Sequence, residues 1–373
     1  MIRFTNPYCR NISVALGVFA MVYVTQVVAE AAPENVPSEL LISAVGDIML
    51  DGTARPEMEK NGYDYAFAGT RALLQQSHIV IGNLEGPLTN RGNGESDKQY
   101  VFRSPPAKVA RALRNAGFDV VSLANNHSLD YGYEGMVDTI DSLAKVGILH
   151  VGAGNNSREA RAPVFVPVGN QMAAFLAYSL TFPENYWATT KSPGTAFGHE
   201  AHIAADVRTA RKYADVVVVS FHWGQESKTE LREYQTRLGR AAIDAGAQAV
   251  IGHHPHILQG VERYKDGVIL YSLGNYTFGS FSPKARVSAV AHLHFNGSRL
   301  SKVRLFPINV SNVDVLFQPK PLNGKDADKV VATLQQLASQ QGTSLRNANG
   351  VAELDMAATV TTAQTEQGQQ GNR

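Results

Sequence analysis

The chain has 373 residues, of which 44% are hydrophobic and 18% are charged, so it can bury a sizeable core and is neither disordered nor membrane-embedded as a whole. Its net charge of +1 at pH 7 provides no positive field for a nucleic-acid backbone, which argues against nucleic acid as a partner. The length favours one large domain with additions.

The amino-terminal residues 1–31 have the pattern of a secretory signal peptide. Arg3 and Arg10 precede an uncharged apolar run at 12–28, and small residues follow it in Ala29-Glu30-Ala31. An uncleaved membrane anchor is the alternative, because the run approaches the roughly 20 residues that a spanning helix needs. We favour cleavage, and therefore expect an exported protein of the periplasm or cell envelope.

Cys9 is the only cysteine, and it lies before the apolar run, whereas a lipoprotein cysteine would follow that run. Removal of residues 1–31 would leave no cysteine, which suits an oxidising compartment and excludes disulfides and thiolate ligands. A metal would then be bound by His, Asp, Glu and Asn side chains.

From residue 40 onward, short apolar runs rich in Val and Ile end abruptly in polar loops, which is typical of buried strands. The expected strands lie at 41–45, 78–81, 120–123, 216–220 and 249–251. The expected helices between them lie at 106–116, 133–146 and 229–245. This alternation predicts an α/β protein with largely parallel sheet built from crossover units.

Two other segments indicate antiparallel hairpins. One covers residues 164–178 and the other residues 287–305, each with a turn that contains Asn and Gly. His292 and His294 alternate along the second hairpin, and we expect them on a surface face. The fold class predicted is a mixed two-sheet core with helices outside.

We predict one principal domain at 38–318. A carboxyl-terminal extension at 319–361 is expected to contain one amphipathic helix near 326–341. The Gln-rich tail at 362–373 is expected to be disordered.

Polar side chains follow each of the five predicted strands. In sheets made of crossover units, ligands bind outside the carboxyl ends of the strands, so these side chains are expected to meet in one crevice. Their carboxylate, amide and imidazole groups suit Mn²⁺, Zn²⁺ or Fe. The residues expected there are Asp47, Asn83, Glu85, Asn126, His127, His222, His254 and His256.

Taken singly, most of these residues have a purely structural explanation. Asp47 could cap a turn, and His222 could be a satisfied core histidine. The segment 252–256 is the strongest fragment, because three imidazoles, including that of His253, stand within four positions of a loop stiffened by a proline. The shared location after a strand favours a joint interpretation as a metal site.

Two further residues are candidates for supporting roles. Arg103 could offer a planar guanidinium to a phosphate or carboxylate, or form a surface salt bridge instead. Glu226 follows His222 closely and could orient a histidine, or be an exposed acid at the start of a helix.

The order of these clusters resembles the calcineurin-like metallophosphoesterases and, more closely, the CapA family of bacterial capsule and poly-γ-glutamate synthesis proteins. The resemblance extends from about residue 43 to residue 278, which is most of the chain after the signal peptide. The matching segments are Gly46–Leu50, Gly82–Thr89, Ala124–Gly132, His222–Glu226, His254–His256 and Tyr271–Asn275.

This resemblance implies a four-layer α-β-β-α sandwich with one or two divalent ions at the strand ends. The ligands implied by matching positions are Asp47, Asn83, Asn126, His222, His254 and His256. His127, with Asn126 beside it, would stabilise or protonate the departing oxygen. A metal-bound water, with its pKa lowered to roughly 7, would be the nucleophile. Independently of the resemblance, we expect Arg103 and His253 to contact substrate.

Two positions depart from the phosphoesterase pattern. Met49 stands where that pattern has a histidine, and Asn83 stands where an aspartate bridges two metals. A neutral amide bridges two dications poorly, so the alternatives are a single ion or a bridge through Glu85.

The sequence therefore predicts an envelope protein of capsule or poly-γ-glutamate synthesis that hydrolyses a phosphoester or related bond with a divalent metal. Its expected partners are an anionic polymer or phosphorylated substrate and a membrane-bound capsule synthase. The alternative is a non-catalytic component that binds the polymer or the synthase. A third hypothesis, a general periplasmic phosphodiesterase or nucleotidase, requires two metals.

Overall fold

A computed structural model of the protein describes residues 39–357. The predicted signal peptide at 1–31 and the predicted tail at 362–373 lie outside the described residues. Between residues 39 and 357, none of the helices combines the length and the apolar character that crossing a membrane requires.

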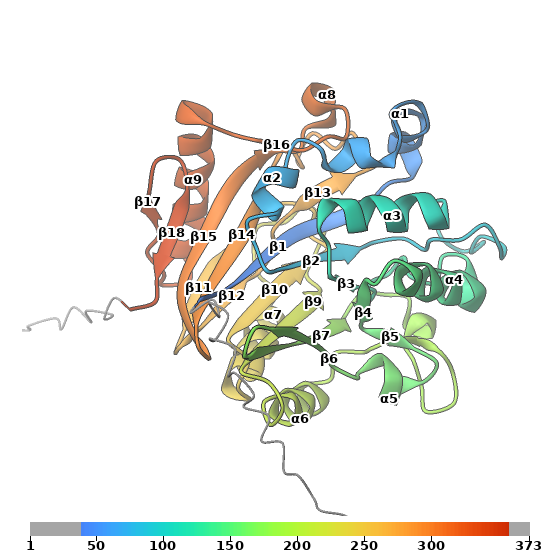
Figure 1. Ribbon diagram of the computed structural model, residues 1–373, viewed down its shortest axis with the longest axis horizontal. Coiled ribbons are helices and arrows are strands. Elements are labelled where there is room, and N and C mark those ends of the chain that lie inside the picture. Colours follow the sequence, from blue (N-terminus) through green and yellow to red (C-terminus); the bar gives the residue numbers. More distant parts are fainter. Residues whose placement is uncertain (1–38, 358–373) are drawn as a thin grey trace, which may run out of the picture. The chain divides into compact units, whose positions relative to one another are not determined.

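The larger sheet has ten strands within the described residues, in the order β17-β18-β15-β14-β1-β2-β3-β4, with β13 paired to β1 and β16 paired to β15 (Figure 1). Its strands are β1 (Glu39–Met49), β2 (Ile79–Leu84), β3 (Val120–Ser122), β4 (Leu149–Val151), β13 (Asn275–Phe278), β14 (Val287–Asn296), β15 (Arg299–Asn309), β16 (Lys320–Pro321), β17 (Arg346–Asn347) and β18 (Ala352–Asp355). The pairs β1–β2, β2–β3, β3–β4 and β1–β13 are parallel. The remaining pairs are antiparallel.

The second sheet has the order β11-β12-β10-β9-β7-β6, with parallel inner strands and one antiparallel strand at each edge. Its strands are β6 (Val164–Val168), β7 (Gln171–Ser179), β9 (Val216–His222), β10 (Ala249–His253), β11 (Val261–Tyr264) and β12 (Gly267–Leu270). A separate short pair joins β5 (Ala153–Gly154) to β8 (Gly194–Thr195). Both sheets are mixed, and the two predicted hairpins are confirmed as β6–β7 and β14–β15.

Helices lie on the outer face of each sheet (Figure 1). Those that pack on the larger sheet are α1 (Arg55–Asn61), α2 (Arg71–Leu74), α3 (Pro106–Ala116) and α4 (Gly132–Lys145). Those that pack on the second sheet are α6 (Glu200–Ala210) and α7 (Glu233–Asp244). The remaining helices are α5 (Ser157–Ala160), α8 (Asn312–Val315) and α9 (Gly324–Ser339), with 3-10 turns at Gly52–Ala54, Tyr63–Phe67 and Glu184–Tyr186.

Three apolar clusters separate four layers. The cluster between the sheets includes Leu293 of β14 and Val218 of β9. The next residue along β9, Val219, points to the opposite face and packs with Leu238 of α7, because successive strand residues alternate between faces. Each such side chain, fully buried, contributes about 1.5–3 kcal/mol. The four-layer α-β-β-α arrangement of mixed sheets predicted from the sequence is confirmed.

Residues 319–357 extend the larger sheet and close one end of the core between the sheets. β18 pairs with β15, and the apolar side of α9, including Val331 and Leu334, joins the cluster between the sheets. Figure 1 shows α9 beside β17 and β18. The extension therefore shares its core with the preceding residues.

The helix expected at 229–245 begins later than expected, at Glu233. The backbone of Arg232 is extended, and its N–H donates to Oε1 of Gln235 at 2.9 Å. This side-chain cap satisfies a backbone group at the helix start, so the first turn begins after Arg232.

The expectation of a surface position is wrong for His292, whose side chain is only 1% exposed. Its neighbour Leu293 faces the core between the sheets, so His292 faces the helical layer, where its ring lies 4.6 Å from that of Phe306. Alternation in a strand identifies a shared face, but it does not reveal that helices cover this one.

Burial of His292 predicts a pH-dependent stability. Burial, and then the nearby His294, lower the pKa of His292 from 6.5 to about 4. Between these two pH values His292 is protonated in the unfolded chain and neutral in the folded chain. The stability that neutral His292 gives is complete above pH 6.5 and is lost as the pH falls to about 4.

We expect His292→Leu to reduce the loss in free energy of unfolding between pH 7 and pH 4 by about 2–3 kcal/mol. Urea unfolding at several pH values, compared between the variant and the unmodified chain, measures this difference. Parallel pH curves for the two proteins would contradict the assignment.

Candidate metal centre

The carboxyl ends of strands from both sheets meet at one edge. In the larger sheet, Asp47 of β1 lies in register with Asn83 of β2 and with Asn275 of β13. In the second sheet, His222 of β9 lies in register with His253 of β10. The sheets are joined here directly, since the backbone N–H of the next residue, His254, donates to Oδ2 of Asp47 at 3.3 Å.

The loop after β10 holds two histidines in an unfavourable backbone conformation. His254 has a φ of 92° and His256 a φ of 59°, backbone angles that residues other than glycine rarely adopt. The ring of His256 is fixed by its Nδ1, which lies 2.9 Å from Oδ1 of Asn275 and 3.1 Å from Oδ2 of Asp47. Strain retained in a well-anchored loop is typical of functional sites.

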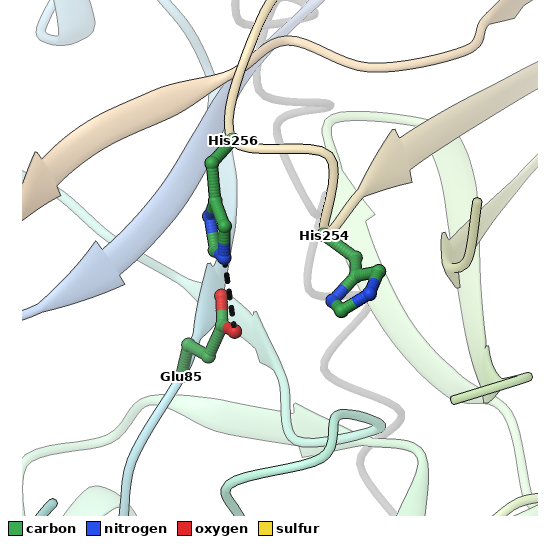
Figure 2. A group of neighbouring side chains, drawn as sticks. All are labelled: Glu85, His254 and His256. Atoms are coloured by element: carbon green, nitrogen blue, oxygen red, sulfur yellow. Dashed lines mark ion pairs between the residues drawn. The ribbon is translucent and has the colours of Figure 1, made fainter. Parts of the chain in front are cut away.

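Glu85, His254 and His256 form a group that could hold a metal ion. Figure 2 shows Glu85 reaching from the end of β2 toward His256, with His254 beside them on the same loop as His256. One ligand atom from each residue lies within 4.8 Å of the others, and Oε1 of Glu85 is 3.8 Å from Nε2 of His256.

This group has the unsatisfied atoms that an ion would satisfy. Glu85 is fully buried, and neither its Oε1 nor Nδ1 of His254 has a hydrogen-bond partner in the part of the chain that the structure describes. A buried carboxylate oxygen without a partner is costly unless a proton or a cation occupies it. The carboxylate and imidazole groups, together with these two unpartnered atoms, therefore fit a divalent ion.

A second group consists of Asp47, Glu85 and His222, again within 4.8 Å of one another. The amide Nδ2 of Asn83 lies among them, 2.9 Å from Oδ1 of Asp47, 3.3 Å from Oε2 of Glu85 and 3.2 Å from Nδ1 of His222. Nε2 of His222 in turn lies 2.8 Å from Oδ1 of Asn126. The structure thus brings all the predicted ligands together.

His127 lines the crevice beside these groups. Its Nδ1 lies 2.7 Å from Oδ2 of the fully buried Asp130, which leaves Nε2 as the nitrogen that can give or take a proton. Asp130 also accepts hydrogen bonds from the ammonium of Lys98 at 2.5 Å and from the backbone N–H of Phe102 at 2.9 Å. Lys98 further donates to the carbonyl of Asn126 at 2.5 Å, so one ammonium holds both ends of the 126–130 turn.

Sequence reasoning missed four residues of this centre. Asp130 and Asn275 lie inside the motifs that carry the family resemblance, and the spacing of Asp130 three residues after His127 was a usable signal. Asn125 directly precedes the predicted pair but was passed over. Lys98 lies in the long connection between β2 and α3, where no local pattern singles it out.

Neither of the two predicted substrate contacts is among the residues that line the crevice. His253 is 1% exposed, and its Nδ1 lies 3.3 Å from Oδ1 of Asp47, so it supports that carboxylate from inside. The guanidinium of Arg103 lies over the ring of Tyr131, 4.6 Å from its centre. Glu226 does line the crevice, but it is exposed and stands in a turn ahead of α7.

The carboxylates and imidazoles act strongly on one another. Burial would raise the pKa of Asp47, but hydrogen bonds and charge from His253 and His256 hold it well below its ordinary value. Burial, and then the charge of Asp47, raise the pKa of Glu85 well above its ordinary value. Two adjacent buried carboxyl groups therefore differ in their affinity for a proton.

The histidines divide in the same way. Burial, and then a neighbouring imidazole, lower the pKa of His222 well below its ordinary value and that of His254 to about 3. Burial would also lower the pKa of His256, but Glu85 and Asp47 raise it to about 9. At pH 7 His222 and His254 are therefore neutral and His256 is protonated, so a metal ion that binds His256 would displace a proton.

The crevice above the group has a volume of about 550 Å³. Its lining includes His127 and His256 together with the rings of Tyr100, Phe102 and Phe278. A concave, largely aromatic lining with a few polar groups is the usual form of a small-molecule or catalytic site.

The fold is a four-layer α-β-β-α sandwich, and buried carboxylates and imidazoles lie together at its strand ends. The protein is therefore of the α/β class and has a candidate metal centre. The chain belongs to the family described as bacterial capsule synthesis protein PGA_cap, whose model matches residues 41–280. The predicted membership in the CapA family is confirmed.

Two similar proteins are the capsule biosynthesis protein CapA of Bacillus anthracis and the PGA biosynthesis protein CapA of Bacillus subtilis strain 168. The first is 31% identical, with 90% of this chain and 83% of the relative covered. The second is 30% identical, with 85% and 82% covered. Among solved structures, the NAD nucleotidase of Haemophilus influenzae has a TM-score of 0.48 at 13% identity, covering 80% of this chain and 62% of that one.

Proposed function

We propose that this chain acts in capsule or poly-γ-glutamate synthesis at the cell envelope, as a divalent-metal-dependent hydrolase of a phosphoester or related bond. The family and its two CapA relatives support the biological role. One observation carries the chemistry: buried, unsatisfied ligand atoms of Glu85 and His254 lie beside the crevice that His127 lines.

The residues divide into ligands and proton carriers. Glu85, His254 and His256 would hold the ion, which when bound supplies an activated water and neutralises charge on the substrate oxygens. His127 holds or delivers a proton at Nε2, and Asp130 fixes the ring through Nδ1. The backbone carbonyl of Asn126 anchors Lys98, which fixes Asp130 in turn.

The proposed substrate is the anionic polymer or a phosphorylated precursor, and the proposed partner is a membrane-bound capsule synthase. Export directed by residues 1–31, which would then be cleaved, would place the crevice on the outer side of the membrane, where we expect the polymer. Polymer binding without catalysis is the alternative that the following experiment separates.

We expect the full chain, loaded with Mn²⁺ or Zn²⁺, to hydrolyse bis-p-nitrophenyl phosphate, and a chelator to abolish the reaction. Release of p-nitrophenolate is measured together with metal content by elemental mass spectrometry. A chain that retains its metal but cleaves neither this diester nor p-nitrophenyl phosphate would refute phosphoesterase activity, and binding to poly-γ-glutamate would then be measured directly.

A further inference from the structure

The hydrogen bonds around Asn83 decide how many ions this centre accepts. We propose that it holds a single divalent ion, bound by Glu85, His254 and His256, and that Asn83 closes the adjacent position as a hydrogen-bond donor. The inference rests on the metal centre of the proposed function and is independent of hydrolysis.

The orientation of Asn125 is the first step. Its Oδ1 accepts the backbone N–H of His127 at 3.0 Å, and its Nδ2 donates to the backbone carbonyl of Leu84 at 2.8 Å. A backbone N–H only donates and a carbonyl only accepts, so the two ends of this amide cannot be exchanged.

The orientation of Asn83 follows from that of Asn125. Nδ2 of Asn125 also donates to Oδ1 of Asn83 at 3.0 Å. Turning the Asn83 amide over would place two NH₂ groups face to face, so its own NH₂ points toward Asp47, Glu85 and His222. Those three residues form the second possible metal group, and the positive end of an amide dipole faces it.

Apart from Oε1 of Glu85, which both groups share, the ligand atoms of that group are also engaged within residues 39–357. Because Nδ1 of His222 faces the NH₂ of Asn83, its Nε2 carries the hydrogen and donates to Oδ1 of Asn126. The two oxygens of Asp47 accept from Asn83 and from the backbone N–H of His254. A second ion would have to break the hydrogen bonds of Asp47 and His222.

The first group differs, because within residues 39–357 two of its residues keep a buried polar atom without a hydrogen-bond partner. Nδ1 of His256 is occupied by Asn275 and Asp47, which leaves Nε2 for a ligand bond. Oε1 of Glu85 and a ring nitrogen of His254 have no partner within residues 39–357. Two histidines and one glutamate form a known ligand set of catalytic zinc sites, with the fourth position open to substrate or water.

Asp47 then acts as a positioning residue. A metal-bound histidine usually gives its other ring nitrogen to a carboxylate or carbonyl, which fixes the ring. His256 meets this description through Asp47 and Asn275.

The test is the number and affinity of ions bound by the metal-depleted full chain, titrated with ZnCl₂ and measured by calorimetry and elemental mass spectrometry. We expect one Zn²⁺ per chain. His254→Gln should weaken binding more than 100-fold, whereas His222→Gln should keep one ion and lose about tenfold in affinity, as a supporting residue does.

Asn83→Asp is the decisive variant, because it keeps the size of the side chain and replaces the NH₂ with a carboxylate oxygen. We expect it to raise the stoichiometry from one ion to two, a gain that misfolding cannot produce. Two ions in the unmodified chain, no ion at all, or equal losses in His222→Gln and His254→Gln would each overturn the inference. One ion without hydrolysis would leave it intact and remove only the hydrolase.

Discussion

His127→Gln is expected to reduce metal-dependent hydrolysis by about 10²–10⁴-fold while leaving the metal content unchanged, since general acid–base groups contribute rate enhancements of this size. The reason is positional. Nδ1 of His127 is hydrogen-bonded to Asp130 and to none of the proposed ligands. The residue lines the crevice, where substrate would enter. Glutamine retains a polar side chain but cannot exchange a proton near neutral pH.

A matched control keeps the same chemical change away from the crevice. His199 is exposed and lies just before α6, so His199→Gln should leave the rate unchanged. The measurement is the initial rate of diester cleavage at saturating Zn²⁺, with metal content determined on the same samples. Full activity in the His127 variant would rule out its proton-transfer role, and a loss of metal would show that the residue belongs to the ligand set.

The local part of this site could be predicted because each candidate residue follows a strand. Val-rich runs define buried strands, and parallel strands present their carboxyl ends at one edge. Glu85 and His254 were therefore expected in one crevice, and the structure places a possible ligand atom of each within 4.8 Å of the other. The same local reasoning gave both hairpins, since each has an Asn and a Gly at its turn.

Other features depend on contacts that no local pattern encodes. Lys98 reaches Asp130 only because the long connection after β2 folds back over the 126–130 turn. His292 is buried beside α2, a distant part of the chain, and the backbone of Leu73 in that helix hydrogen-bonds to it. The direction of the Asn83 amide depends on Asn125, and thus on backbone groups of two separate segments. Residue identity predicted membership in the site, whereas three-dimensional context assigned the roles.

The close approach of two backbones under the centre gives the other large expected effect. A Cβ at Gly46 would lie 1.8 Å from the carbonyl oxygen of Gly274 and 2.8 Å from its carbon. Both contacts are with backbone, so β1 and β13 would have to separate. We expect Gly46→Ala to lower the free energy of unfolding by about 3 kcal/mol or more, the scale of severe overpacking.

Gly62→Ala provides the control, because the same methyl group would meet no atom within 4 Å and only the φ of 81° opposes it. Its cost should be about 1 kcal/mol. Urea unfolding measures both variants, and a Gly46→Ala protein within 1 kcal/mol of the unmodified chain would contradict the prediction.

Gly46→Ala should also weaken Zn²⁺ binding, although Gly46 is not one of the proposed ligands. The backbone N–H of Asp47 donates to the carbonyl of Gly274 at 3.0 Å, and β1–β13 pairing sets Asp47 beside Asn275. These two side chains hold the ring of His256 from opposite strands, so separating the strands removes the orientation of one ligand. Zn²⁺ affinity measured under conditions where the variant remains folded should fall about tenfold or more, and an unchanged affinity would show that the ring is fixed by its own loop.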